Sequence, residues 1–114
     1  MVPLKLFICL LIRFRARFTR LAGPRCTARF FEHFRRYVEA MGREAERRDR
    51  DHVLDLESFI RERRDSSAIS LSFSLIEYAL DIDLPDQVFE DQNFTTAYLA
   101  SVDMIFLANV SCSR

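Results

Sequence analysis

An asparagine and a serine near the end of the chain have the spacing of two ligands on one helix face. Asn109 and Ser113 lie at the end of an apolar run that begins at Leu99. Residues four apart on a helix lie on the same side, one turn from each other. A carboxamide and a hydroxyl oxygen are donors that a hard cation accepts. The pair predicts part of a metal site, but the spacing is common by chance and needs support from the rest of the chain.

Two adjacent arginines form the second pattern with chemical potential. Arg63 and Arg64 stand at the end of a predicted helix, directly before Ser66 and Ser67, which interrupt the apolar periodicity. A cation is favourable at a helix C-terminus in any protein. A guanidinium at such a place can also fork onto a phosphate. An arginine pair is usually a solvated surface feature, so both interpretations stay open at this point.

Composition limits the class of protein. A chain of 114 residues with 49% apolar residues can form one domain with a modest core. Residues 1–64 hold 16 Lys/Arg and 9 Asp/Glu, a net +7, and residues 65–114 hold 1 and 8, a net −7. The basic half could attract an anionic partner. We expect instead that the two halves face each other. Three scattered cysteines predict reduced, buried thiols and a cytoplasmic location.

The N-terminal segment is apolar from Leu4 to Ile12 but is too short to span a bilayer. Arginines follow it from Arg13 onward, where the cleavage site of a signal peptide requires small residues. We therefore predict no membrane span and no secretion. Residues 1–17 are treated as a separate N-terminal segment, which a misplaced gene start would explain.

The elements that must position these residues are all predicted to be helices. Apolar residues recur every three or four positions, only two glycines and three prolines interrupt the chain, and no strand alternation is present. Thr27 is the expected cap of the first helix after the Gly23-Pro24 break, and Asp51 that of the next. The expected helices cover residues 27–48, 51–65, 69–80, a short turn at 87–90, and 92 to the end.

Several stretches, in this order, resemble class I terpene synthases, and the fungal sesquiterpene cyclases most. They are residues 55–67 (DLESFIRERRDSS), 72–77 (SFSLIE), 84–89 (LPDQVF) and 103–113 (DMIFLANVSCS), supported by Arg29-Phe30 and the acid-rich run to Glu46. The likeness covers residues 18–114, which we expect to be a partial terpene synthase helical domain, and residues 1–17 are expected to lie outside the family. The likeness implies an all-α fold: a partial helical bundle of the class I terpenoid synthase type, with about four to five helices.

The resemblance also implies a function. It is that of a terpene cyclase that ionises and cyclises an isoprenyl diphosphate, with farnesyl diphosphate as the expected substrate and Mg²⁺ as cofactor. Asn109 and Ser113 would be magnesium ligands, and Arg64 would bind the diphosphate with Arg63 as the neighbouring candidate. Ala68 replaces the glycine that the family commonly has at the helix break, which leaves the geometry of the break open.

Parts of the family's site are not found in this sequence. The third magnesium ligand, a glutamate, would fall at position 117, and no aspartate precedes Arg29 to form an aspartate-rich motif. We therefore expect an internal fragment, truncated at both ends and inactive alone.

Two other functions remain as alternatives. One is a non-catalytic helical interaction module whose exposed apolar faces bind another helical chain or a second copy of this one. The other is an anion-surface binder that uses the basic half for nucleic acid or membrane. The basic residues are interleaved with glutamates and the aromatic residues have the spacing of a core. We therefore expect no nucleic-acid partner.

Overall fold

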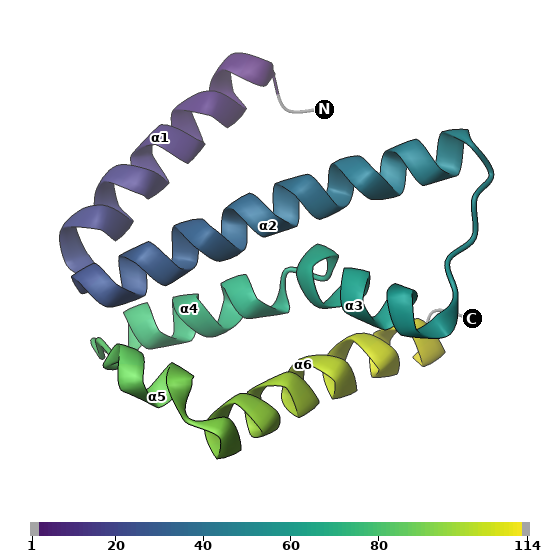
Figure 1. The fold of residues 1–114 in the computed structure, drawn as a ribbon. Coiled ribbons are helices and arrows are strands. Elements are labelled where there is room, and N and C mark those ends of the chain that lie inside the picture. Colours follow the sequence, from purple (N-terminus) through teal and green to yellow (C-terminus); the bar gives the residue numbers. More distant parts are fainter. Residues whose placement is uncertain (1–2, 113–114) are drawn as a thin grey trace.

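The computed structural model describes residues 3–112, and throughout them the regular elements are helices. There are six of them in that range: α1 (Leu4–Leu21), α2 (Pro24–Asp49), α3 (Leu56–Ser66), α4 (Ile69–Ala79), α5 (Asp86–Glu90) and α6 (Gln92–Cys112), as Figure 1 shows. The all-α prediction is confirmed. Helix α1 is additional to the helices expected from the sequence, and α5 is the short turn expected at 87–90.

The long helix α2 organises the fold. Helices α3 and α4 follow one another along one side of α2 and contact it, and α6 packs on the other side of α3 and α4 (Figure 1). Helix α1 folds back beside α2, and Figure 1 shows the two diverging from their junction. Helices α2, α3–α4 and α6 therefore form a layer of three packed rows.

Two hydrophobic clusters hold this layer together. The first consists of the buried side chains of Phe18 on α1 and Cys26 and Phe30 on α2, and Leu71 and Tyr78 of α4 pack against it. The rings of Phe18 and Phe30 lie with their centroids 4.4 Å apart. The second joins α3, α4 and α6 through Ile69, Val102 and Phe106, with Ile60, Phe73 and Tyr98 packed against them. The apolar periodicity thus faces the neighbouring helices, as an amphipathic helix requires.

The start of α2 differs from the prediction. Thr27 was expected to cap the helix, but the helix begins three residues earlier, at Pro24, because a proline has the backbone angle that the first helical position requires. The capping bond comes from a distant residue. The Asp83 carboxylate accepts the Cys26 N–H at 2.8 Å. A Cβ atom at Gly23 would collide with the same Asp83 side chain, so this approach requires glycine.

The second expected cap, Asp51, is also wrong. Asp51 has φ of 55° and follows α2, and the next N–H, of His52, donates to the Arg47 carbonyl at 3.0 Å. This is the hydrogen bond of a left-handed helix C-terminus. Asp51 therefore closes α2, and α3 begins only at Leu56.

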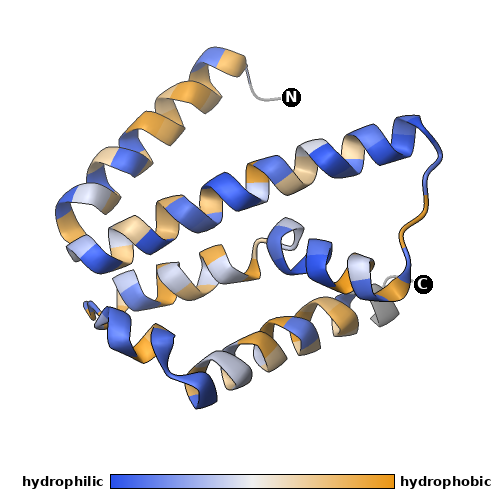
Figure 2. Cartoon of the chain, in the orientation of Figure 1, coloured by the Kyte–Doolittle hydropathy of each residue, from blue (hydrophilic) through white to orange (hydrophobic). Residues whose placement is uncertain are grey.

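Large apolar side chains of α1 and α6 remain exposed. In α1 they include Leu4, Leu6, Phe7, Ile8, Leu10, Leu11 and Ile12, and in α6 Met104, Ile105 and Leu107. Figure 2 shows the corresponding hydrophobic colour along α1 and α6. Cys9 is exposed as well, contrary to the expectation of buried thiols, because few residues cover this part of α1. Among the described residues, no helix is both long and apolar enough to cross a membrane.

Candidate functional site

The break between α3 and α4 is a single left-handed residue. Ala68 has φ of 62° and ψ of 15°, and it separates Ser67, the C-cap of α3, from Ile69, which begins α4. A left-handed conformation costs a residue with a Cβ about 1–2 kcal/mol. The helix break is present although position 68 is alanine. We therefore expect alanine in place of glycine to lower the stability of the fold without removing the break.

Arg64 is already paired across the helix layer. Its Nε and Nη2 donate to Oδ1 and Oδ2 of Asp103 on α6 at 2.9 and 2.8 Å. Such a forked pair is the strongest arrangement of an arginine and a carboxylate. The hydrogen bonds from Arg64 lower the pKa of Asp103, and those to Asp103 raise the pKa of Arg64. The arginine expected to bind diphosphate is therefore held by a carboxylate in this structure.

Arg63 has weaker partners. Its Nη1 donates to the Ser66 hydroxyl at 3.3 Å and lies 3.6 Å from a carboxylate oxygen of Glu44 on α2. Its Nε is buried and has no hydrogen-bond partner. A buried donor without a partner is costly. Arg63 lines a cavity between α2 and α3, separate from the cavity that Arg64 lines.

The two expected magnesium ligands are described unequally. Asn109 is exposed on α6, whereas Ser113 lies outside the described residues. Between residues 3 and 112 no group of three His, Cys, Asp or Glu side chains could hold a metal ion. Asn109 alone is a neutral donor, and magnesium is usually bound by one or two carboxylates. The described residues therefore do not form a complete magnesium site by themselves.

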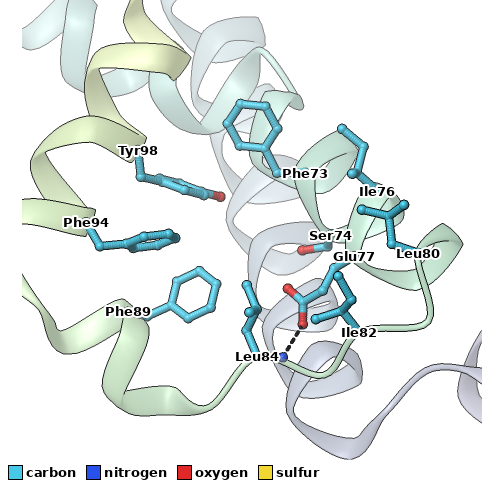
Figure 3. Close-up of a pocket in the computed structure, with 10 residues that line it drawn as sticks. All are labelled: Phe73, Ser74, Ile76, Glu77, Leu80, Ile82, Leu84, Phe89, Phe94 and Tyr98. Atoms are coloured by element: carbon cyan, nitrogen blue, oxygen red, sulfur yellow. Dashed lines mark hydrogen bonds between the residues drawn. The ribbon is translucent and has the colours of Figure 1, made fainter.

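An aromatic pocket lies between α4, α5 and α6 (Figure 3). It has a volume of about 240 Å³ and is lined by Phe73, Ser74, Ile76, Glu77, Leu80, Ile82, Leu84, Phe89, Phe94 and Tyr98. Phe73 meets Tyr98 edge to face with ring centroids 5.2 Å apart, and Phe89 meets Phe94 in the same way at 5.0 Å. Burial raises the pKa of Tyr98 above its ordinary value, because the ionised form is disfavoured away from water. The faces of such rings stabilise cations.

A second cavity, of about 520 Å³, shares three of these rings. Phe89, Phe94 and Tyr98 line it together with several charged side chains, among them Arg36, Arg61 and Arg64. The three shared rings therefore border an apolar cavity and also a cavity lined by several arginines. Apolar chains and anionic groups could both be accommodated near these rings.

A buried ion pair supports the aromatic pocket. Arg29 of α2 donates through Nη2 to Glu77 of α4 at 2.7 Å, and to the Leu84 carbonyl at 3.0 Å. Its Nη1 donates to Asp86 at 3.0 Å, and its guanidinium lies 4.0 Å from the centroid of the Phe89 ring. Glu77 also accepts the Leu84 N–H at 3.1 Å, as Figure 3 shows. We call these five residues the Arg29 network.

The Arg29 network explains three of the stretches in the sequence resemblance. Arg29, Glu77 and the 84–89 link are far apart in the chain, but they meet around one guanidinium. The network and the Arg64–Asp103 pair also join the basic half of the chain to the acidic half, as expected from the charge distribution. No role for Asp103 was predicted from the sequence. Its only sequence signal was an isolated acid in an apolar run.

Comparison with known proteins agrees with this geometry. The sequence profile of terpene synthase family 2, C-terminal metal binding, matches residues 2–113. The chain belongs to this family. The match includes α1. The family resemblance and the all-α fold are thereby confirmed, and the family's description as metal binding agrees with the expected cofactor class.

Three fungal relatives show how much of a family member is present. The bifunctional terpene synthase Agr4 of Cyclocybe aegerita is 49% identical over 96 residues, which are 84% of this chain and 28% of the relative. A sesquiterpene synthase of Galerina marginata is 44% identical over 104 residues, 90% of this chain and 30% of the relative. A Coprinopsis cinerea protein named linoleate 10R-lipoxygenase COP4 is 49% identical over 96 residues, which are 84% of this chain and 28% of the relative. This member of the terpene synthase family thus spans less than a third of these relatives.

Proposed function

We propose that this chain supplies part of the active site of a terpene cyclase that ionises and cyclises an isoprenyl diphosphate, with farnesyl diphosphate as substrate. The observation that carries the proposal is the family match over residues 2–113. The names of two relatives, a bifunctional terpene synthase and a sesquiterpene synthase, support the choice of substrate class. The aromatic pocket agrees with it, since a C15 hydrocarbon needs an apolar enclosure with ring faces toward a cation.

The roles of the residues follow from their chemistry. Arg63 and Arg64, at the end of α3, are the proposed diphosphate-binding residues. Asn109 and Ser113 are the proposed oxygen donors to Mg²⁺, which when bound neutralises charge on a departing diphosphate. Two neutral oxygens do not complete a magnesium site. We therefore propose that the 114-residue chain is inactive alone and that the whole enzyme provides the remaining ligands.

A graft into a relative tests the proposal. The matching 104-residue segment of the Galerina marginata enzyme would be replaced by that of this chain, and the product would be incubated with farnesyl diphosphate and Mg²⁺. We expect volatile terpenes from the graft and none from the isolated chain. A graft carrying both Arg63→Gln and Arg64→Gln is the matched control and should release none. A correctly folded graft without product would contradict the proposed function.

A second candidate is a non-catalytic helical interaction module. The observation that favours it is the exposed apolar surface of α1, where Leu4 is 72% and Ile12 is 62% exposed. A contiguous apolar surface on a small protein usually marks an interaction site. Self-association that neither Mg²⁺ nor inorganic diphosphate changes, together with an inactive graft, would favour this function over the cyclase.

A further inference from the structure

One side of the hairpin formed by α1 and α2 presents apolar side chains to solvent. Phe18 of α1 packs against Phe30 of α2, and the two helices diverge from this contact (Figure 1). Counted from Phe18 at about 100° per residue, Leu4, Ile8 and Ile12 lie on one flank of α1, about 40–120° around the helix. All three are exposed. They form an apolar row along the part of α1 that α2 does not cover.

The apolar row continues on α2. Helices α1 and α2 run in opposite directions from their junction, so the same sense of rotation from their contact leads to the same side of the hairpin (Figure 1). Counted from Phe30 in that sense, Phe34 lies about 40° and Val38 about 80° around α2, and both are exposed. Arg15 of α1 lies over the ring of Phe31 on this side, 5.6 Å from its centroid. We call the following side chains the docking face: Leu4, Ile8, Ile12, Phe34 and Val38.

The charged side chains of α1 are all cations without carboxylate partners among the described residues. Helix α1 has no Asp or Glu, and its five cations are Lys5, Arg13, Arg15, Arg17 and Arg20. Most arginines of α2 and α3, in contrast, are paired with a carboxylate. The partner that complements α1 is therefore an apolar medium bordered by negative charge.

An anionic lipid surface has this chemistry. An interfacial helix buries its apolar side at the edge of the acyl chains and keeps Lys and Arg near the anionic headgroups. As a helix, residues 4–12 extend about 14 Å, half the thickness of the hydrocarbon core, which suits a helix lying at the interface. Nucleic acid would attract the cations but leave the apolar row uncovered. A second copy docked face to face would bring the cations of two α1 helices together, which is unfavourable.

We propose that the α1–α2 hairpin binds the surface of an anionic lipid bilayer through the docking face, with the cations of α1 at the level of the headgroups. Leu4, Ile8 and Ile12 enter the boundary of the acyl chains, and the two α2 side chains of the docking face lie beside them. Lys5, at the edge of this face, reaches the headgroups because its aliphatic stem can lie along apolar surface. The proposal does not depend on the cyclase function, since none of these side chains belongs to the proposed diphosphate and magnesium site.

Vesicle flotation tests the proposal on the full chain. The protein, at a concentration at which analytical ultracentrifugation shows a monomer, is mixed with vesicles of equimolar phosphatidylcholine and phosphatidylserine and floated through a sucrose gradient. Protein bound to vesicles rises, whereas aggregates sink. We expect the chain to float with these vesicles and much less with vesicles of phosphatidylcholine alone, because each cation near an anionic surface strengthens binding. Equal flotation with both kinds of vesicle, or with neither, would overturn the proposal.

Two pairs of substitutions on α1 decide whether the docking face makes the contact. Ile8→Gln with Ile12→Gln changes the docking face, and Leu6→Gln with Leu10→Gln is the matched control on the other flank. The exposed fractions are similar, 45% and 62% against 51% and 52%. We expect the first pair to weaken vesicle binding about thirtyfold and the control to stay within about threefold. Val38→Gln should weaken binding as well, because the face includes α2. Equal losses in the two pairs would contradict the docking face.

A charge variant separates a lipid surface from other partners. Lys5→Gln with Arg13→Gln should weaken binding to the mixed vesicles about thirtyfold, the contribution of two cations near an anionic surface. Circular dichroism checks that every variant keeps its helices. If the charge variant abolishes flotation while Ile8→Gln with Ile12→Gln does not, α1 is a general anion binder, as for nucleic acid, and the proposal fails. It also fails if the docking-face variants abolish a dimer of a chain that does not float, because the face then belongs to a second copy.

Discussion

Removing Arg29 tests whether the Arg29 network supports the fold. In Arg29→Met the side chain keeps most of its apolar length, but Glu77 loses its cation. Glu77 is 7% exposed, and besides Arg29 it is bonded by the Leu84 N–H, which carries no charge. Removing one partner of a buried ion pair lowers the free energy of unfolding by about 3–5 kcal/mol, because the other charge is left buried and unpaired. Loss of the cation–π contact with Phe89 adds about 1 kcal/mol.

This loss is large for a chain of 114 residues. Domains of such size have about 5–15 kcal/mol of stability, so the variant should lose a large part of its unfolding free energy. Urea unfolding followed by circular dichroism, at low micromolar concentration to limit association, measures the difference. Glu77→Gln should cost less than Arg29→Met, because Arg29 keeps Asp86 and the Leu84 carbonyl.

The control is Arg61→Met, in which the pair with Glu57 is solvent-exposed and should contribute less than about 1 kcal/mol. If Arg29→Met costs as little as this control, the buried charge of Glu77 must be satisfied in another way. The argument that the Arg29 network holds α2 to α4 would then be refuted.

Three further predictions follow from single features of the fold. Ala68→Gly should stabilise the chain by about 1 kcal/mol in urea unfolding, because glycine removes the left-handed penalty at the break, whereas Ala45→Gly at an exposed position near the end of α2 should cost about 1 kcal/mol. Burial and the nearby Glu77 carboxylate raise the pKa of the Cys26 thiol from its ordinary 9.0 to about 11. Because the folded pKa is the higher one, unfolding free energy should fall as pH rises from 9 toward 11, and the fall should be smaller in Cys26→Ala. Ile8→Lys with Ile12→Lys should reduce self-association in analytical ultracentrifugation, and unchanged association would place the contact elsewhere than on α1.

The helices and their class followed from the sequence because they depend on local patterns. Apolar spacing of three and four residues, with few glycines and prolines, predicted α4 and α6 almost to their end residues. The family resemblance also followed from the sequence, since it rests on short motifs in a fixed order. The helix starts near Thr27 and Asp51 were misplaced, because the cap of α2 is supplied by Asp83 from beyond α4, and no local pattern shows a cap that comes from so far away.

The site itself depended on tertiary structure. Arg63 and Arg64 are adjacent and chemically identical in the sequence, and only packing sends one toward Asp103 on α6 and the other toward Glu44 on α2. Residues Arg29, Glu77 and Leu84 looked like separate motifs, and only the fold brings them to one guanidinium. Sequence periodicity fixes which face of a helix is apolar. Helix packing decides which charged side chains pair across 39 or 48 residues of chain. The packing sets which side chains share a space from which water is excluded.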